Sequence, residues 1–442
     1  MLRKSLLLMV VCGFVATFAA SVNADTRVSA SKKGSLIYYS KVELKWNAAG
    51  ALTQDTFLTI VNDYTQDVFV QWYFVNGDAP LAAVFNGGLL VERSHRGWNW
   101  ADCNTEVTHN ESNYMSMARG TPLGCQPFTI LDPGTPQGRP DPDGPAGSRV
   151  LRGFAVAFAV DEDGNEISWN HLSGHADIVD YANRSAWEYN GFAFQCNASS
   201  TEGNPCGSDN ILDLNGSEYD SGFSALLFDF YAVGSQAFSL GTTIVTLDTD
   251  LTLYPITQDL RQDNDGPVTT KAKIDIWNQN EDGFSGSIHC ITCWDQTLLS
   301  NYAATNNFLI GNIHTDKGKA RIDGVASSDC DPVGSCCNLS TDPDCFPSAN
   351  HPAIDESCSE AASLLGVSNK ILVFSGAVTG RTDAGMTLVG QGTESGYFKW
   401  DVIDGPLPLQ TDPDLIVPVQ VDVEETIATP RTLSRGQRQG KD

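Results

Sequence analysis

The chain has 442 residues, of which 41% are hydrophobic and 18% charged, and its 54 acidic and 27 basic residues give a net charge of −27. A field of that sign repels phosphate groups, so it excludes nucleic acid and anionic lipid surfaces as main partners. The length is enough for two or three domains of roughly 150 residues each.

The first 24 residues have the parts of a secretory signal peptide. Arg3 and Lys4 precede an apolar run, Ser5–Ala20, and small residues end the segment at Ala24. The run is short for a membrane span, and polar residues follow it at once. We therefore expect a secreted protein, extracellular or periplasmic, with no membrane span after the signal is removed.

Residues 35 to 78 predict a β-meander of three strands. These strands are Leu36–Trp46, Thr56–Val61 and Val68–Val75. In the first strand, Val42 and Leu44 alternate with Glu43 and Lys45, which predicts one face on a core and the other in water. The third strand is apolar almost throughout, as expected for a strand that is covered on both faces.

Further strands are predicted at near-regular spacing up to residue 255, with almost no helical period between them. They are Leu81–Glu92 (interrupted at Asn86-Gly87-Gly88), the hairpin Arg149–Trp169, Ile178–Tyr181, Ala186–Gln195, Phe223–Val233 and Thr242–Tyr254. Two segments between them, Arg93–Gln126 and Asp132–Ser148, are predicted as long loops. The pattern is typical of an antiparallel sandwich or a jelly-roll-like body.

The polar segment 257–267 is the predicted linker between a large domain, residues 25–256, and a smaller β-rich domain, residues 268–404. The smaller domain is expected to contain these strands: Thr270–Trp277, Ser285–Trp294, Phe308–His314, Lys319–Val325, Ile371–Val378 and Tyr397–Ile403. A Cys-rich loop spans 327–358, and a short helix ending at Gly366 is expected after it. Residues 405–442 are predicted to be a flexible tail.

The fold class that these elements predict is all-β. We expect two β-sandwich domains, Ig-like or jelly-roll-like, with long disulfide-stapled loops and at most one or two short helices.

Eleven of the twelve cysteines lie outside the signal peptide, and in an exported chain they are expected to form disulfides. Cys103–Cys125 and Cys196–Cys206 are the natural local pairs. Cys290 and Cys293 form a Cys-x-x-Cys motif, which we interpret as a disulfide, with a redox pair or half of a zinc site as alternatives. The odd number leaves at least one free thiol or one bond to another chain.

His171 and His175 are followed by Asp177, and two histidines with a carboxylate are a possible metal site. Gly174 intervenes and the flanking residues are strand-like, so the two rings need not converge. The alternative interpretation is that they are ordinary loop and turn histidines.

Asp161 and Asp163 begin a segment that resembles a calcium loop, Asp-x-Asp-Gly-Asn. The EF-hand pattern requires a glutamate where Leu172 stands, and a hairpin turn explains the same residues without an ion. We expect no cofactor, with calcium as the alternative here or at Asp141-Pro142-Asp143-Gly144.

Trp98 and Trp100 lie two residues apart, so both rings of an extended segment face the same way. Exposed paired rings bind sugar faces or a partner protein, and the alternative is that they cover one end of the sandwich.

The chain contains neither Gly-x-Ser-x-Gly nor His-Glu-x-x-His, so no hydrolase motif is present. We expect an exported, non-enzymatic surface or extracellular β-protein that is structural or binds a protein or glycan partner through its long loops. One alternative is a secreted carbohydrate-active enzyme or glycan-binding protein that uses carboxylates and the two tryptophans. The other is an extracellular protein that binds calcium or zinc.

Overall fold

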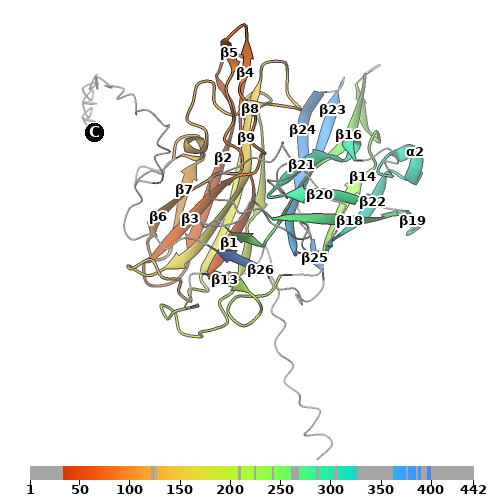
Figure 1. Ribbon diagram of the computed structural model, residues 1–442. Coiled ribbons are helices and arrows are strands. Elements are labelled where there is room, and N and C mark those ends of the chain that lie inside the picture. Colours follow the sequence, from red (N-terminus) through yellow and green to blue (C-terminus); the bar gives the residue numbers. More distant parts are fainter. Residues whose placement is uncertain are drawn as a thin grey trace, which may run out of the picture. The chain divides into compact units, whose positions relative to one another are not determined.

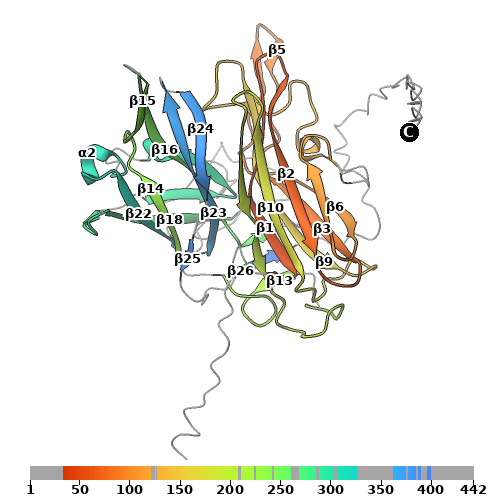
Figure 2. The same cartoon turned by 180° about the vertical axis from the view of Figure 1, so that it is seen from behind.

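The computed structural model describes most of the chain between residues 33 and 399 (Figures 1 and 2). The described residues are 33–120, 125, 127–207, 211–222, 225–240, 243–259, 268–284, 288–302, 307–325, 362–374, 377–384, 387–389 and 396–399. The predicted signal peptide, the Cys-rich loop 327–358 and the predicted tail lie outside these residues.

The prediction of an all-β protein is confirmed, and the largest sheet contains ten strands. These are β1 (Leu36–Trp46), β2 (Leu52–Asn62), β3 (Val68–Asn76), β6 (Trp100–Val107), β7 (Glu111–Ser116), β8 (Arg139–Pro140), β9 (Arg149–Val160), β10 (Leu172–Asp180), β11 (Ser185–Asn190) and β12 (Phe192–Phe194). The main path through the sheet has the order β11-β10-β2-β1-β9-β3-β6, and all its pairs are antiparallel.

A separate two-stranded sheet pairs β4 (Val84–Asn86) with β5 (Leu89–Glu92). Three further sheets hold the strands that follow residue 210. The six-stranded sheet contains β14 (Ala225–Tyr231), β18 (Thr269–Asn278), β19 (Gly283–Phe284), β20 (Ile288–Thr292), β22 (Lys317–Val325) and β25 (Thr387–Val389). The five-stranded sheet contains β15 (Gln236–Leu240), β16 (Thr243–Pro255), β21 (Asp295–Leu298), β23 (Leu364–Phe374) and β24 (Ala377–Ala384). The three-stranded sheet contains β13 (Ile211–Leu214), β17 (Gln258–Asp259) and β26 (Gly396–Lys399).

In the part of the chain that the structure describes, helices are few and short. They are the 3-10 turns η1 (Phe128–Leu131) and η2 (Leu299–Asn301) and the single-turn helix α2 (Ile310–Ile313). Among the described residues, no helix has the length and apolar character needed to cross a bilayer.

A bulge in β1 changes which residues face each side of the ten-stranded sheet. Before it, Leu36 and Tyr38 lie in one hydrophobic cluster and Tyr39 lies in the other. The register against β9 shifts between Tyr39 and Val42, and after this shift the even-numbered Val42 joins the cluster of Tyr39. An extra residue in one strand inverts the alternation beyond it. The odd-numbered residues that follow, beginning with Lys41, therefore turn to the side that Leu36 and Tyr38 occupy.

Both faces of the ten-stranded sheet are buried at its central strands β1 and β9. The cluster that contains Tyr39 and Val42 also includes Met115, Met117 and Phe128 from the segments after β6. The cluster that contains Leu36 and Tyr38 extends into the strands after residue 210. The expectation that Glu43 faces water is therefore wrong, because this second cluster lies on its side of the sheet and Glu43 is fully buried.

The long loop predicted at Arg93–Gln126 contains the strands β6 and β7, so that prediction is wrong. β6 pairs with β3 over eight residues and ends the main path of the sheet. β6 contains few apolar residues, because only one of its two faces is covered by other parts of the protein. Glu106, for example, is exposed next to the buried Val107. A strand of this kind has too few apolar residues for its period to be recognised.

Two predictions in the second half of the chain are also wrong. The predicted strand Phe308–His314 contains α2, which ends where His314 adopts a left-handed backbone conformation with φ of 57°. The predicted helix ending at Gly366 is instead the start of β23, where Gly366 pairs with Leu253 of β16. A Cβ at Gly366 would come within 2.2 Å of the Thr252 carbonyl oxygen, so the close approach of the two strands requires glycine here.

The predicted return strand of the hairpin, after residue 165, is reduced to the isolated bridges Val160–Glu166 and Ile167–Pro205. The division into two domains at 257–267 stays a prediction. Contacts do cross it: the Trp294 indole donates a 2.9 Å hydrogen bond to the Ser40 carbonyl oxygen.

Candidate functional site

The most exposed apolar segment of the described residues is the hairpin formed by β4 and β5, which we call the apolar finger (Val84–Val91). In Figures 1 and 2 it projects at one end, beyond the neighbouring strands. The side chains of Val84, Phe85, Leu89, Leu90 and Val91 are between 48% and 74% exposed. Exposed apolar residues scattered singly are ordinary, but five in one hairpin make it the candidate interaction site.

The sequence of the finger explains its shape. Asn86 pairs with Leu89, so Gly87 and Gly88 form a two-residue turn. Their φ angles of 58° and 81° lie in the left-handed region, which a tight hairpin turn requires and glycine adopts without strain. The finger is therefore an ordered turn between two short strands.

The finger is attached to the rest of the protein by a group of charged residues, which we call the stem cluster (Glu92, Arg93, His95, Asp132 and Arg149). Arg149, at the start of β9, lies 3.6 Å from Glu92 at the end of β5. Arg93 pairs with the buried Asp132 and donates a 2.6 Å hydrogen bond to the Pro136 carbonyl oxygen. These contacts connect the base of the finger to the ten-stranded sheet.

His95 is the least exposed residue of the stem after Asp132, and neither of its ring nitrogens has a hydrogen-bond partner among the described residues. Its Nε2 lies 4.0 Å from the Asp132 carboxylate. Burial lowers the pKa of His95 below its usual 6.5, although the charges of Asp132 and Asp78 act in the opposite direction. The backbone of His95 bonds to Leu81 in both directions, which closes the finger at its base.

A chain of ion pairs leads from this end of the sheet to the second half of the protein. Asp78 accepts hydrogen bonds from Arg139 at 3.0 Å and from the Arg152 Nε at 3.1 and 3.2 Å. The Arg152 Nη1 donates to the Gln296 side chain at 3.1 Å, and the Gln296 amide donates to Asp250 at 3.0 Å. Polar contacts therefore run continuously from Asp78, which follows β3, to Asp250 in β16.

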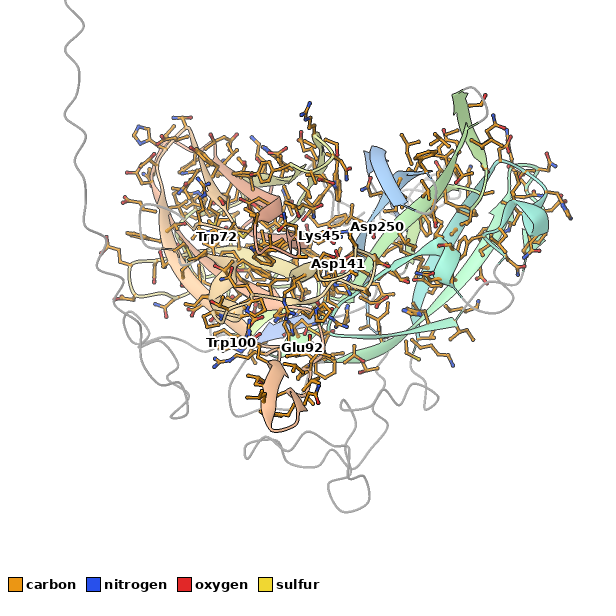
Figure 3. All side chains as sticks on the ribbon, turned by 90° about the horizontal axis from the view of Figure 1, so that it is seen from above. Lys45, Trp72, Glu92, Trp100, Asp141 and Asp250 are labelled. Atoms are coloured by element: carbon orange, nitrogen blue, oxygen red, sulfur yellow. A yellow bond between two sulfur atoms is a disulfide. The ribbon has the colours of Figure 1, made fainter. Side chains whose placement is uncertain are left out.

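Asp250 belongs to what we call the central charge network (Lys41, Glu43, Lys45, Asp141 and Asp250), three of whose members are labelled in Figure 3. The ammonium of Lys41 lies 2.6 Å from Asp250 and 3.3 Å from Glu43. Lys45 lies 3.6 Å from Glu43 and 3.2 Å from Asp141. Each buried charge thus has an opposite charge beside it, which offsets the cost of removing it from water. Through Lys41 and Asp250, this network connects β1 of the ten-stranded sheet with β16 of the five-stranded sheet.

Trp98 and Trp100 do not form an exposed pair. Both are partly buried and pack against the cluster that contains Leu36. Trp100 pairs with Val75 at the edge of the sheet, and its ring lies 5.4 Å from that of Tyr73. This packing fits the alternative that they cover one end of the sandwich, and ligand binding by the two tryptophans stays a prediction.

The histidines of the proposed metal site are held apart by an extended chain. His171 precedes β10 and pairs with Asp63 at 3.1 Å, whereas His175 lies within β10, 3.6 Å from Asp177. Four residues of extended chain separate the two backbone positions by about 13 Å, and the two rings pair with different carboxylates, so metal binding here stays a prediction. Within the part of the chain that the structure describes, no three metal-ligating side chains form a group.

Asp161 and Asp163 form a closed turn. The Asp161 carboxylate accepts hydrogen bonds from the backbone of Asp163 at 3.0 Å and of Asn165 at 2.8 Å. This turn is stable without an ion. Calcium binding here stays a prediction.

The two local disulfides, Cys103–Cys125 and Cys196–Cys206, are present, so both predictions are confirmed. The predicted pair Cys290–Cys293 is wrong, because Cys290 is in a different disulfide and Cys293 is a buried free thiol. Their odd separation explains this result: Cys290 is exposed on β20, while Cys293 points into the core. Burial raises the pKa of the Cys293 thiol to about 12.

No known family model matches this chain, and no curated protein matches it in sequence. The site must therefore be interpreted from its own residues. The finger was predicted only as an interrupted strand, but the sequence does contain a signal for it. Residues 79–91 include no charged side chain, and the apolar residues on both sides of the two glycines are adjacent rather than alternating.

Proposed function

We propose that the protein is an exported, non-enzymatic binding protein that attaches to an apolar surface of its partner through the apolar finger. The observation that carries this proposal is the exposure of five apolar side chains on one ordered hairpin. Export is supported by the signal sequence and by the two disulfides, which persist in oxidising compartments.

The energetics favour binding. Covering a large apolar side chain contributes up to about 2 kcal/mol, so Phe85, Leu89 and Leu90 together can support a moderate affinity. The finger is already ordered by its turn and its stem, so binding does not require a flexible loop to be fixed.

Adsorption of the folded protein to octyl-agarose tests this proposal. We expect the double substitution F85S/L90S to remove most of the retention, because these two side chains face the same side of the finger. A matched control, Y114S/I288S, replaces an aromatic and an aliphatic residue that are 70% and 59% exposed elsewhere. Equal retention of the two double variants would contradict the proposal.

Both variants must keep the melting temperature of the wild type, since all four side chains are solvent-exposed. A large loss of stability in F85S/L90S would show that the finger is packed against the protein rather than available to a partner.

A further inference from the structure

The apolar finger is apolar on both of its faces. Phe85 pairs with Leu90, and cross-strand partners share a face of a hairpin. Leu89, the most exposed of the five residues, is next to Leu90 in the strand and so faces the other side. A flat partner would cover one face and leave the other in water. The occupant must therefore surround the finger.

The size of the finger argues against a protein partner. A stable protein interface buries about 1,200–2,000 Å² and uses roughly 20–30 residues on each side. The finger has eight residues, and each of its strands pairs over only three. The same limit excludes a second copy of this chain joined through the finger alone. A lipid layer has no such requirement, because acyl chains close around whatever enters them.

The length of the finger fits the depth of a membrane interface. Three residues of a strand span about 10 Å, and interfacial elements bury their apolar side about 5–10 Å below the headgroups. The outer edges of β4 and β5 pair with no other described strand. Their backbone groups need water or headgroups as partners, which prevents deeper insertion.

Charge sets both the limit of insertion and the kind of lipid. The uncharged segment 79–91 is bounded by Asp78, which pairs with Arg152, and by Glu92, which pairs with Arg149. The net charge of −27 repels an anionic surface. The chemistry of the finger and of the whole chain together therefore fits a lipid surface without net charge.

We infer that the apolar finger inserts into the interface of an electrically neutral lipid layer, with Phe85, Leu89 and Leu90 as the inserted side chains. This inference rests on the proposed function and names the class of its partner. A protein that binds in this way lies at a membrane surface without crossing the bilayer.

Sedimentation with vesicles tests the inference on the full chain. We expect the wild type to bind vesicles of pure phosphatidylcholine, and F85S/L90S to bind at least about tenfold more weakly, because two anchoring side chains are lost. Y114S/I288S is expected to bind like the wild type. Addition of phosphatidylserine to the vesicles is expected to weaken binding at low ionic strength, and salt is expected to restore it.

A fluorescent label that senses polarity shows the position of the finger directly. L89C, labelled in its native state, is expected to give a blue-shifted and brighter emission with phosphatidylcholine vesicles, whereas labelled Y114C is not. The wild type treated in the same way gives the background, to which the buried Cys293 contributes little.

Three outcomes would overturn the inference. If the wild type does not bind phosphatidylcholine vesicles but octyl-agarose still retains F85S/L90S less than Y114S/I288S, the partner is a protein and the proposed function stands. If neither assay depends on the finger, both proposals are wrong. If the vesicles bind all variants equally, or bind more tightly when anionic, another surface of the protein carries the binding.

Discussion

The ammonium of Lys41 donates a 2.6 Å hydrogen bond to the carboxylate of Asp250, which lies 209 residues later in the chain. Both side chains are at most 2% exposed. Lys41 has this position because the bulge in β1 turns it to the inner side of the sheet. One irregularity in the first strand thus places one of the contacts that join the two halves of the protein.

We predict that K41M destabilises the protein by about 3–5 kcal/mol, because it leaves the buried Asp250 without its cation. Methionine keeps most of the side-chain volume, so the loss measures the charge rather than a cavity. The shift of the urea midpoint, converted with the wild-type slope, gives the value.

Lys45 provides the control for this measurement. Its side chain is 22% exposed, and its partners Glu43 and Asp141 lie farther away, at 3.6 and 3.2 Å. We expect K45M to cost about 1 kcal/mol. Equal effects of K41M and K45M would show that the burial of Lys41 has no special role.

We predict that His95 makes the folded protein less stable as the pH is lowered. The folded protein holds the pKa of His95 below 6.5, so the unfolded chain binds more protons in acid. This contribution is fully present above pH 6.5 and is lost as the pH falls toward the folded pKa. The wild type should therefore lose stability relative to H95Q between pH 7.5 and 5, by at most about 1.4 kcal/mol per pH unit.

Urea unfolding of both proteins across this pH range gives the two free energies of unfolding. Their difference isolates His95, because the contributions of the titratable groups that both proteins contain cancel. If the wild type instead becomes more stable relative to H95Q in acid, the charges of Asp132 and Asp78 affect the pKa of His95 more than the burial of its ring does.

The thiol of Cys293 is predicted to resist alkylation in the folded protein. It is 2% exposed, and its pKa of about 12 leaves little thiolate at neutral pH. Peptide mapping after treatment with iodoacetamide should find Cys293 unmodified in the native state and modified in guanidinium. Rapid native labelling at this position would contradict its burial.

Gly97 lies just after the stem cluster, where the chain passes close to Asp78. A Cβ at residue 97 would come within 1.7 Å of the Asp78 carbonyl oxygen. We expect G97A to destabilise the protein by about 1–3 kcal/mol, since the backbone must move. The control is G311A, where a Cβ meets nothing within 4 Å. Thermal melting of the two variants is a direct comparison, and equal melting temperatures would contradict the close approach.

Strand positions with strong apolar character could be predicted from the sequence, and β1 was predicted with its observed limits. β6 and β7 could not, because their alternation is dominated by polar residues, and β6 ends the main path of the sheet. The start of β23 was misjudged for the opposite reason. Leu364 and Leu365 are buried together, and a short apolar run fits a helix as well as a strand.

The partners of charged residues depend on contacts between distant segments. No local pattern indicates that Glu43 would be buried beside Lys41, because the bulge that places them there adds one residue to an otherwise regular alternation. The two local disulfides could be predicted from short loops. The motif at Cys290 and Cys293 was misinterpreted because the two residues lie on opposite faces of the chain.

The pairing of Lys41 with Asp250 also has a consequence for the order in which the protein is made. A ribosome releases β1 long before Asp250 exists, and an N-terminal segment generally folds first during synthesis. Here that segment contains Glu43 but lacks Asp250, the nearer of the two carboxylates that pair with Lys41. The charged site around Lys41 is therefore complete only after residue 250 has been synthesised, so this buried pair forms late in the synthesis of the chain.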